Sequence, residues 1–490
     1  MKLQKLMSSI NIIDTNVDFD CDINKIASDS RKLEKNDVFV ALRGEHVDGN
    51  LFINEAIKRN VKAIITDKKE VPKNIPYILV DNARSTLSRM WSNYYDNPTK
   101  EMKILSITGT NGKSTTAELL YGILKSADLP RGLISTIRCL INDEKFSHGG
   151  GSEMSSVYSA MTTPDSEVLY YILFRMKEKG VKYVVLETSS HSLKQSKLDG
   201  LNVNVGAFTN LSHEHLDFHK SIEDYYKSKE LLLKKSEICV INTDDLYGKL
   251  LYDTYKHKSF SISSNANADF IIKEDCCGNK CLKFEITNKD GSITLCSRLQ
   301  GKYNMYNIAM ASSIAKILGI SDENIADGIW KTSSIKGRME KYKNKNIYID
   351  YAHTPYATKC VLEALKDAEN DKKIIALVGC GGERDKEKRR EIGEICSNLA
   401  DILIITSDNP RGEEPLSIIK DILKGVEKNK THYIIPSRRE AILYACEMLD
   451  ENSVLILLGK GHENYEINNL GKHYFNERDI LDEAFKNEKN

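Results

Sequence analysis

Residues 106–116 read SITGTNGKSTT, and they follow the apolar run MKILSI and precede the amphipathic segment TTAELLYGILKSA. A strand, a glycine turn and a helix in this order form the usual phosphate-binding context, because amide groups at a helix N-terminus point toward the anion. The general P-loop pattern requires a glycine at position 107, where this chain has Ile107. The stretch therefore predicts a nucleotide-phosphate site, as a degraded P-loop or a distinct shorter form, with a plain Asn-Gly turn as the alternative.

The side chains of this turn suit a nucleotide and its metal ion. Lys113 would place a positive charge near the outer phosphates, and the Ser114 hydroxyl can ligate magnesium. The candidate nucleotide-binding residues of the turn are Gly109, Thr110, Asn111, Gly112, Lys113, Ser114 and Thr115.

The 490-residue chain is too long for one hydrophobic core, and its pattern separates three blocks. The first, residues 1–98, has short strand-like runs (DVFVAL, KAIITD, YILV). The second, residues 99–334, contains the glycine turn and the runs YVVLE, VGAFTN and ICVIN, which are typical of buried parallel strands. The third, residues 335–490, alternates strands and helices, which predicts a doubly wound α/β domain that binds ligands at the carboxyl ends of its strands.

Composition places the chain among ordinary globular proteins, with 41% apolar and 29% charged residues. Lys plus Arg and Asp plus Glu number 70 each, so bulk charge attracts neither nucleic acid nor an acidic membrane. The N-terminal MKLQKLMSSI lacks the apolar core of a signal peptide, and no run approaches the roughly 18 apolar residues of a membrane span. We expect a cytoplasmic protein without nucleic-acid or membrane partners.

Cysteine and histidine clusters offer two alternative metal sites. The eleven cysteines form no regular framework, so we expect reduced thiols rather than disulfides. Cys276, Cys277 and Cys281 lie near Cys296, but without a zinc-like CxxC pair. The histidines at 213, 215 and 219 match neither HExxH nor a zinc finger, so the sequence favours a structural zinc at neither place.

Three further features have a functional and a structural interpretation. Glu187 ends the strand YVVLE, where a carboxylate beside a phosphate loop can contact a metal. Lys229 in DYYKSKELL would by itself be a solvated helix lysine. The stretch KEKRRE at residues 386–391 is expected to be a solvated helix start.

The order of motifs along the whole chain resembles that of the ATP-dependent Mur ligases. The motifs are TGTNGKST, LETSSHSL, FTNLSHEHLDFH, YYKSK, GKYNMYN, GRME and IDYAHTP. In that family the shortened G-T-N-G-K-[ST] loop is the normal form, so Ile107 is not a defect. The resemblance implies an α/β fold of three domains: an N-terminal UDP-binding domain, a central P-loop ATPase-like domain with a parallel sheet, and a C-terminal Rossmann-like domain.

The resemblance also implies the ATP and metal sites. Lys113, Glu187, His215 and Lys229 would be the catalytic residues. Magnesium would be held by Ser114, Glu187, His215 and Lys229, the last as a carbamate formed with carbon dioxide. Further ATP contacts would come from Asn304, Arg338, Asp350 and His353.

Two groups of substrate residues are carried over in the same way. The UDP-muramoyl-peptide contacts would be Ser30, Thr162, Thr163, Ser189, Gln195 and Lys197. The incoming amino acid would meet Arg384, Asp408, Asn409, Arg411, Gly459 and Glu463. An arginine at position 411 can form a fork with a carboxylate, and DNPR resembles the form that selects meso-diaminopimelate over L-lysine.

The implied reaction is amide-bond formation in peptidoglycan precursor synthesis. ATP would phosphorylate the D-glutamate γ-carboxylate of UDP-N-acetylmuramoyl-L-alanyl-D-glutamate, and the amine of meso-diaminopimelate would displace the phosphate, in a monomeric enzyme. Departures from the family spelling (Lys197, His213, Glu214, Arg390, Glu466) leave two alternatives open. These are L-lysine or another amino acid as acceptor, and a nucleotide switch without ligase activity.

Overall fold

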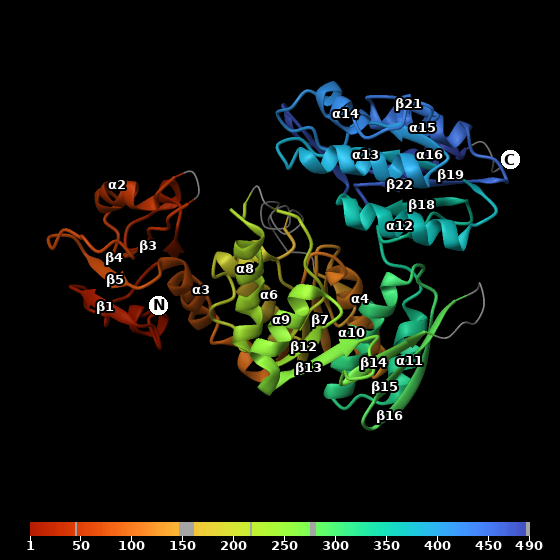
Figure 1. The fold of residues 1–490 in the computed structure, drawn as a ribbon. Helices are drawn as coiled ribbons and strands as arrows, with labels where there is room; N and C mark the ends of the chain where they lie inside the picture. Colours follow the sequence, from red (N-terminus) through yellow and green to blue (C-terminus); the bar gives the residue numbers. More distant parts are fainter. Residues whose placement is uncertain (45–46, 147–160, 216–217, 275–280, 487–490) are drawn as a thin grey trace. The chain divides into compact units, whose positions relative to one another are not determined.

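The computed structural model describes residues 1–44, 47–146, 161–215, 218–274 and 281–486. The chain divides into two compact units, whose elements are labelled in Figure 1. The first unit comprises residues 1–106, 130–206 and 234–237, and the second comprises residues 107–129, 207–233 and 238–490. None of the helices in the described ranges has the length and apolar character needed to cross a lipid bilayer.

The N-terminal strands form a five-stranded sheet in the order β1-β5-β4-β3-β2. Its strands are β1 (Ile12–Thr15), β2 (Ile26–Ala27), β3 (Val38–Val40), β4 (Ala63–Thr66) and β5 (Tyr77–Val80). The neighbouring helices are α1 (Leu3–Leu6), α2 (Ile53–Lys58) and α3 (Ala83–Tyr94). Strands β2 to β5 pair in parallel, and β1 pairs antiparallel with β5. The predicted runs DVFVAL, KAIITD and YILV are therefore confirmed as β3, β4 and β5.

The longest sheet has eleven strands in the order β16-β15-β14-β13-β12-β11-β6-β10-β7-β8-β9. They are β6 (Lys103–Thr108), β7 (Arg131–Ile134), β8 (Cys139–Ile141), β9 (Glu144–Lys145), β10 (Tyr183–Glu187), β11 (Val203–Phe208), β12 (Ser236–Asn242), β13 (Ser259–Ser263), β14 (Phe270–Glu274), β15 (Leu282–Asn288) and β16 (Gly291–Ser297). The associated helices are α4 (Lys113–Ser126), α6 (Ser166–Glu178), α7 (Ser190–Lys194), α8 (Ile222–Lys235), α9 (Leu246–Tyr255), α10 (Tyr303–Ile317) and α11 (Asp322–Lys331). The runs YVVLE, VGAFTN and ICVIN are confirmed as strands.

One cysteine pair contradicts the expectation of reduced thiols. Cys281 precedes β15 and forms a disulfide with Cys296 of β16, across a Cα–Cα distance of 6.1 Å. The two strands are antiparallel neighbours, with Lys283 opposite Cys296, so their register brings the two cysteines within disulfide reach. Cys276 and Cys277 lie outside the described residues.

The C-terminal sheet has six strands in the order β17-β18-β22-β19-β20-β21. They are β17 (Glu340–Lys341), β18 (Ile347–Asp350), β19 (Lys373–Val378), β20 (Ile402–Ile405), β21 (His432–Ile434) and β22 (Ser453–Leu458), and a hairpin follows with β23 (Tyr465–Asn468) and β24 (Gly471–Tyr474). The helices are α12 (Pro355–Ala368), α13 (Glu387–Leu399), α14 (Pro415–Leu423), α15 (Arg438–Glu447) and α16 (Glu477–Ala484).

Alternate residues of the buried strands belong to two separate hydrophobic cores, one on each face of the sheet. Helices therefore pack on both faces, which confirms the predicted doubly wound domain. One core joins sheet residues such as Ile456 to apolar residues of α12, α13 and α14. The other joins residues such as Leu455 and Leu457 to α15 and α16. The loops at the carboxyl ends of β18, β19, β20 and β22 lie along one edge of this sheet, where such folds build a binding site.

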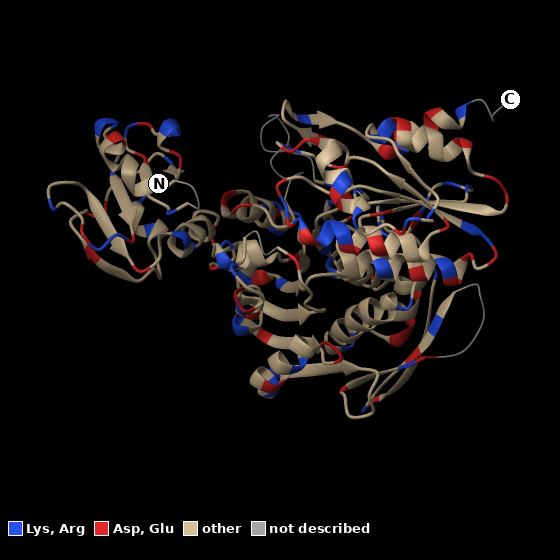
Figure 2. Ribbon diagram, turned by 45° about the horizontal axis from the view of Figure 1, so that its top comes forward, with Lys and Arg blue, Asp and Glu red and all other residues tan. Residues whose placement is uncertain are grey.

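Acidic and basic residues are interspersed along most elements (Figure 2), as the balanced composition predicts. Arg389 in KEKRRE is an exception, since its side chain is fully buried. Its guanidinium forms ion pairs with Glu413 at 2.9 Å and with Asp421 at 3.0 Å. The prediction of a solvated helix start is therefore wrong for Arg389, because the acids that accompany it come from a later loop and from α14.

Two adjacent arginines on α15 allow a matched test of buried and exposed ion pairs. Arg438 and Glu477 are both buried and lie 2.6 Å apart, whereas Arg439 and Glu483 are both about half exposed. We expect Arg438→Met to lower the free energy of unfolding by about 3–5 kcal/mol, since it leaves a buried carboxylate uncompensated. Arg439→Met should cost less than about 1 kcal/mol. Urea denaturation of both variants measures the difference, and equal losses would contradict it.

Candidate functional site

The 109–112 turn has the geometry of a phosphate loop. Strand β6 ends at Thr108, and α4 begins at Lys113. Gly109 has φ 151° and Gly112 has φ 85°. A Cβ at Gly109 would lie 1.8 Å from Thr209 Oγ1, and one at Gly112 would lie 2.2 Å from Asn307 Oδ1. Both positions therefore require glycine, and the predicted strand–turn–helix order is confirmed.

Residues that follow β11 hold this turn in place. The amide of Thr110 donates to the carbonyl of Asn210 at 2.8 Å, and the amide of Asn111 donates to Asn210 Oδ1 at 2.9 Å. The hydroxyl of Thr209 donates to the carbonyl of Asn111 at 2.6 Å. Ser114 and Thr115, in the first turn of α4, are buried. The conformation of the 109–112 turn thus depends on hydrogen bonds to Thr209 and Asn210, which directly follow β11.

Two lysine ammonium groups meet at one carbonyl of the turn. Lys113 Nζ donates to the carbonyl oxygens of Gly109 at 3.0 Å and Thr110 at 2.8 Å, and Lys229 Nζ donates to Gly109 at 2.6 Å. Lys229 is only 1% exposed, so its interpretation as a solvated helix lysine is wrong. Burial, and then the charge of Lys113, hold the pKa of Lys229 well below its ordinary value. An anion placed here would relieve the repulsion between the two cations.

His215 lies close to Tyr225, the residue whose ring also contacts Lys229. The ring of Tyr225 has its centroid 6.1 Å from that of His215 and 4.5 Å from Lys229 Nζ. Burial lowers the pKa of His215 despite the nearby Glu214 carboxylate, and Lys113 adds to the effect. The imidazole is therefore favoured in its neutral form, which is the form that ligates metal ions.

A contact joins this region to the segment that follows β18. His353 Nε2 lies 2.8 Å from Glu214 Oε1, and its Nδ1 lies 2.8 Å from the carbonyl of Tyr351. Burial alone would raise the pKa of Glu214, but the neighbouring His215 and His353 hold it well below its ordinary value. Glu214 thus links the loop after β11 to the third block of the sequence.

Asp350 and Asn304 are buried and Arg338 is half-buried, all three in the same unit. Arg338 Nη2 donates to Ser114 Oγ at 3.0 Å, and its guanidinium lies 4.8 Å from the centroid of the Tyr351 ring. The carboxylate of Asp350 accepts from the amides of Met339 and Ala352. Asn304 lies in α10, where its Oδ1 accepts from Asn307 Nδ2 at 2.9 Å. The structure therefore brings Arg338 and Ser114 together, as a shared phosphate contact requires.

The first unit holds the residues proposed for the peptide substrate. Thr163 Oγ1 donates to the carbonyl of Glu187 at 3.0 Å and accepts from the amide of Ser189 at 3.0 Å. Ser189 caps α7, Gln195 ends it, and Lys197 pairs with Asp165 at 2.7 Å. These residues and Thr162 lie near the carboxyl end of β10. Ser30 lies apart in the short 3₁₀ helix Ser30–Lys32, and no hydrogen bond or ion pair links it to this group within the described residues.

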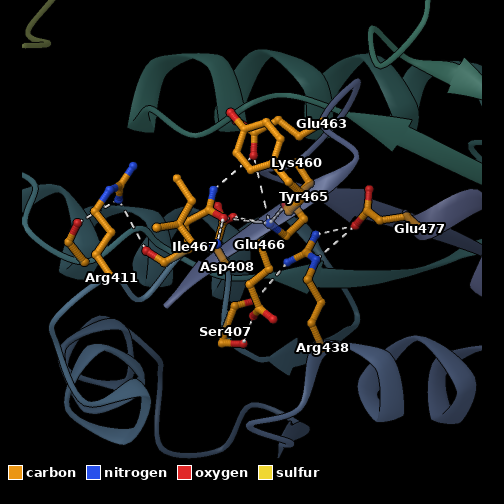
Figure 3. A network of polar contacts seen from close by, with 12 residues as sticks. Ser407, Asp408, Arg411, Arg438, Lys460, Glu463, Tyr465, Glu466, Ile467 and Glu477 are labelled. Carbon is orange, nitrogen blue, oxygen red and sulfur yellow. Dashed lines mark hydrogen bonds and ion pairs between the residues drawn. The ribbon is translucent and has the colours of Figure 1, made fainter. Parts of the chain in front are cut away.

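A buried polar network lies at the carboxyl ends of β20 and β22 (Figure 3). Asn409 Nδ2 donates to Glu463 Oε2 at 3.0 Å, and Tyr465 donates to Glu463 Oε1 at 3.2 Å. Lys460, which is fully buried, lies 3.3 Å from Asp408 Oδ1. Gly459, with φ 110°, would bring a Cβ within 3.0 Å of Asp408 Oδ2. The structure therefore places Asp408, Asn409, Gly459 and Glu463 together, as the sequence predicts.

Arg411 lies at the rim of this network, in a left-handed backbone conformation with φ 52°. Its Nη1 donates to the carbonyl of Gly382 at 2.8 Å and lies 3.3 Å from that of Asn409. Arg384 is exposed on the same loop as Gly382. Two arginines and two carboxylates thus offer both charges to a ligand. The described ranges contain no cluster of three His, Cys, Asp or Glu side chains that could hold a metal ion by themselves.

Three family profiles match successive stretches of the chain. The Mur ligase family, catalytic domain profile matches residues 22–95, and the Mur ligase middle domain profile matches residues 107–315. The Mur ligase, glutamate ligase domain profile matches residues 337–461. The chain belongs to the Mur ligase family.

Relatives of known name agree with this membership. The chain is 38% identical over 498 residues to the UDP-N-acetylmuramoyl-L-alanyl-D-glutamate–2,6-diaminopimelate ligase of Clostridium tetani, covering 99% of each chain. It is 34% identical over 492 residues to the ligase of the same name from Clostridioides difficile, again covering 99% of each. A solved structure of a ligase of that name aligns with a TM-score of 0.68 at 27% identity, over 100% of this chain and 99% of the other. The chain therefore has the three-domain α/β architecture of Mur ligases.

Three site residues of this Mur ligase were missed by the sequence analysis. Glu214 was noted only as a departure in spelling, Arg389 was assigned to solvent, and Lys460 was not singled out. A signal for Lys460 was present in the sequence. The lysine stands between two glycines directly after the apolar run SVLILL, which places it at the end of a buried strand. No comparable signal marks Glu214 or Arg389, since their partners are remote in sequence.

His462 of this Mur ligase generates a pH prediction. Its ring packs on Tyr351 at a centroid distance of 4.7 Å, and burial followed by the charges of Arg338 and Lys336 holds its pKa well below 6.5. Between the folded-state pKa and 6.5 the unfolded chain binds more protons, so the free energy of unfolding rises with pH, by at most about 1.4 kcal/mol per pH unit. Above 6.5 this contribution is constant.

The variant His462→Phe keeps a ring against Tyr351 and removes the titrating group. We expect the difference in unfolding free energy between wild type and variant to rise with pH on the acid side and to level off near neutrality. Chemical denaturation across that range checks this, and a difference independent of pH would contradict the assignment.

Proposed function

We propose that this chain is an ATP-dependent ligase that joins meso-diaminopimelate to UDP-N-acetylmuramoyl-L-alanyl-D-glutamate, as a UDP-N-acetylmuramoyl-tripeptide synthetase of peptidoglycan precursor synthesis. Relatives at 34–38% identity that carry this ligase name, with 2,6-diaminopimelate as the amino acid, support the proposal. The single observation that carries it is the position of Arg411 beside the Asn409–Glu463 pair. A nucleotide switch would need no such paired charges.

The charged groups at the far end of the amino acid distinguish meso-diaminopimelate from L-lysine as the acceptor. The far end of meso-diaminopimelate carries an ammonium and a carboxylate. Glu463 can accept from the ammonium, and the Arg411 and Arg384 guanidinium groups can donate to carboxylates through bidentate forks. L-lysine has only the ammonium at its far end, so a buried or half-buried arginine opposite it would lack a partner. This is the physical reason to prefer the meso diamino acid.

The reaction joins a carboxylate to an amine and therefore needs activation by ATP. The γ-carboxylate oxygen attacks the terminal phosphorus, ADP leaves, and the amine nitrogen then attacks the acyl carbon and releases phosphate. The chain contributes position and charge rather than a covalent nucleophile. In this proposal the amides of the 109–112 turn and Lys113 bind the phosphates, while Asn304, Arg338, Asp350 and His353 bind the rest of ATP.

The side chains near the turn fit magnesium. Ser114 offers a hydroxyl and His215 an imidazole whose pKa is lowered by burial, and both groups can ligate a divalent cation. Glu187, whose Oε1 is buried and has no hydrogen-bond partner among the described residues, would be the carboxylate ligand that the family pattern implies. Bound magnesium would neutralise charge on the transferred phosphoryl group. Burial and the charge of Lys113 lower the pKa of Lys229, which increases the share of the uncharged amine, the form that adds to carbon dioxide. Its carbamate would replace a cation by an anionic ligand and relieve the repulsion by Lys113.

Further parts of the proposal concern the other substrate and the organisation of the chain. Ser30, Thr162, Thr163, Ser189, Gln195 and Lys197 would contact the UDP-muramoyl-peptide. The domains would span residues 1–98, 99–334 and 335–490, in a monomeric cytoplasmic enzyme.

Amino-acid specificity is the first test. With ATP, magnesium and UDP-N-acetylmuramoyl-L-alanyl-D-glutamate, we expect phosphate release with meso-diaminopimelate and little with L-lysine or L,L-diaminopimelate. Arg411→Met should raise KM for meso-diaminopimelate by about 10- to 150-fold, the value of a lost charged hydrogen bond, and leave KM for ATP unchanged. Arg390→Met, an exposed arginine of α13, is the control. Release with L-lysine alone would overturn the choice of acceptor, and release independent of any amino acid would favour a nucleotide switch.

Carbamylation of Lys229 is tested by removing carbon dioxide. Wild-type activity should fall in bicarbonate-depleted buffer and return when bicarbonate is restored, and a carbamate resonance should appear in NMR spectra with ¹³C-bicarbonate. Lys229→Met should lose activity by about 10²-fold or more and show neither response. Lys227→Met, an exposed neighbour on α8, should behave as wild type. A carbamate resonance that persists in Lys229→Met would assign the modification elsewhere.

A further inference from the structure

Lys460 is a buried cation that the proposed function has not used. It follows β22 between Gly459 and Gly461, and its side chain is fully buried. A Cβ at Gly461, which has φ 53°, would lie 2.8 Å from the Tyr351 Cα, so backbone packs closely around this turn. A long charged side chain is rarely buried without a specific set of partners.

The ammonium of Lys460 donates two hydrogen bonds and lies near two carboxylates (Figure 3). It donates to Asn409 Oδ1 at 3.0 Å and to the carbonyl of Tyr465 at 2.9 Å. It forms an ion pair with Asp408 Oδ1 at 3.3 Å, and Glu463 Oε2 lies farther away at 3.9 Å. The side chain therefore has a single well-defined arrangement rather than a range of partners.

This arrangement fixes which way the Asn409 amide faces. Asn409 Oδ1 accepts from Lys460 Nζ and from the amide of Ile467 at 3.0 Å. If the amide were reversed, its NH₂ group would meet two donors and its oxygen would face Glu463. With Oδ1 held in this way, Nδ2 donates to Glu463 and keeps a second N–H that has no hydrogen-bond partner among the described residues.

Lys460 also opposes part of the negative charge of this network. Asp408 and Glu463 are two carboxylates in a buried setting, and Lys460 is near both. Burial raises the pKa of Glu463, and Asp408 raises it further, while Lys460 opposes the rise. Two carboxylates opposed by an ammonium repel a ligand carboxylate less than two unopposed ones, so a ligand end with one positive and one negative group fits this network better than it would without Lys460.

We propose that Lys460 is a positioning residue for the incoming amino acid, which orients the Asn409 amide toward Glu463 and so selects a far end that carries both an ammonium and a carboxylate. This inference rests on the proposed function and adds to it a specificity determinant that does not itself touch the substrate. Its effect should appear in recognition of the amino acid and not in recognition of ATP.

The test compares Lys460→Met with wild type and with Lys359→Met, an exposed lysine on α12. We expect Lys460→Met to raise KM for meso-diaminopimelate about tenfold, the lower end of the range for one charged hydrogen bond, because Lys460 acts through Asn409. KM for ATP and kcat should stay within about threefold, and the preference for meso-diaminopimelate over L-lysine should fall. Lys460→Gln keeps one donor for Asn409 Oδ1 and should give an intermediate KM. Lys359→Met should match wild type.

Each outcome of this comparison either supports or overturns the proposed role of Lys460. An unchanged KM for meso-diaminopimelate in folded Lys460→Met would overturn the inference and leave the proposed function intact. A wild-type enzyme that does not consume meso-diaminopimelate would overturn both. If Lys460→Met does not fold, by thermal melting and ATP binding, then Lys460→Gln replaces it with the same criteria. Failure of both variants to fold, or a parallel rise of every KM, would assign Lys460 to stability and overturn the inference.

Discussion

The contact between the 109–112 turn and its neighbours is the constraint on which the nucleotide region depends. Backbone of the turn lies directly against Thr209 and Asn307, at distances that leave no room for a Cβ at either glycine. The carbonyl of Gly109 then receives both lysine ammonium groups. A side chain at either position would displace the carbonyl on which Lys113 and Lys229 converge, so packing and charge in this region cannot be changed independently.

Four of the buried basic side chains in the described ranges divide into two kinds. Arg389, Arg438 and Lys460 each form an ion pair with a buried or half-buried carboxylate, which compensates the cost of removing their charge from water. Lys229 instead donates to a carbonyl and faces another lysine. The first three hold segments around the C-terminal sheet in place. Burial and the charge of Lys113 lower the pKa of Lys229, which favours the uncharged amine more than at an exposed lysine.

Local sequence patterns predicted most of the helices and strands, because apolar runs, helical spacing and glycine turns depend on residues that are neighbours in the sequence. The strands YVVLE and ICVIN and the start of α4 after Gly112 follow from such patterns. Partners remote in sequence could not be predicted in this way. Glu214 and His353 are 139 positions apart, and Cys281 meets Cys296 only through strand register. The structure brings several residues that the family resemblance implies close to one another, such as Asn409 and Glu463, but the resemblance could not say which side chains hold them there.

The left-handed backbone of Arg411 has a consequence for evolution. For residues other than glycine, and to a lesser degree asparagine and aspartate, this conformation costs about 1–2 kcal/mol. Random drift at the position is therefore biased toward glycine and asparagine, which relieve the strain. An arginine at this position keeps a conformational cost that a glycine or an asparagine would lower. Under the role proposed for Arg411, a change to glycine would exchange recognition of a carboxylate for backbone stability.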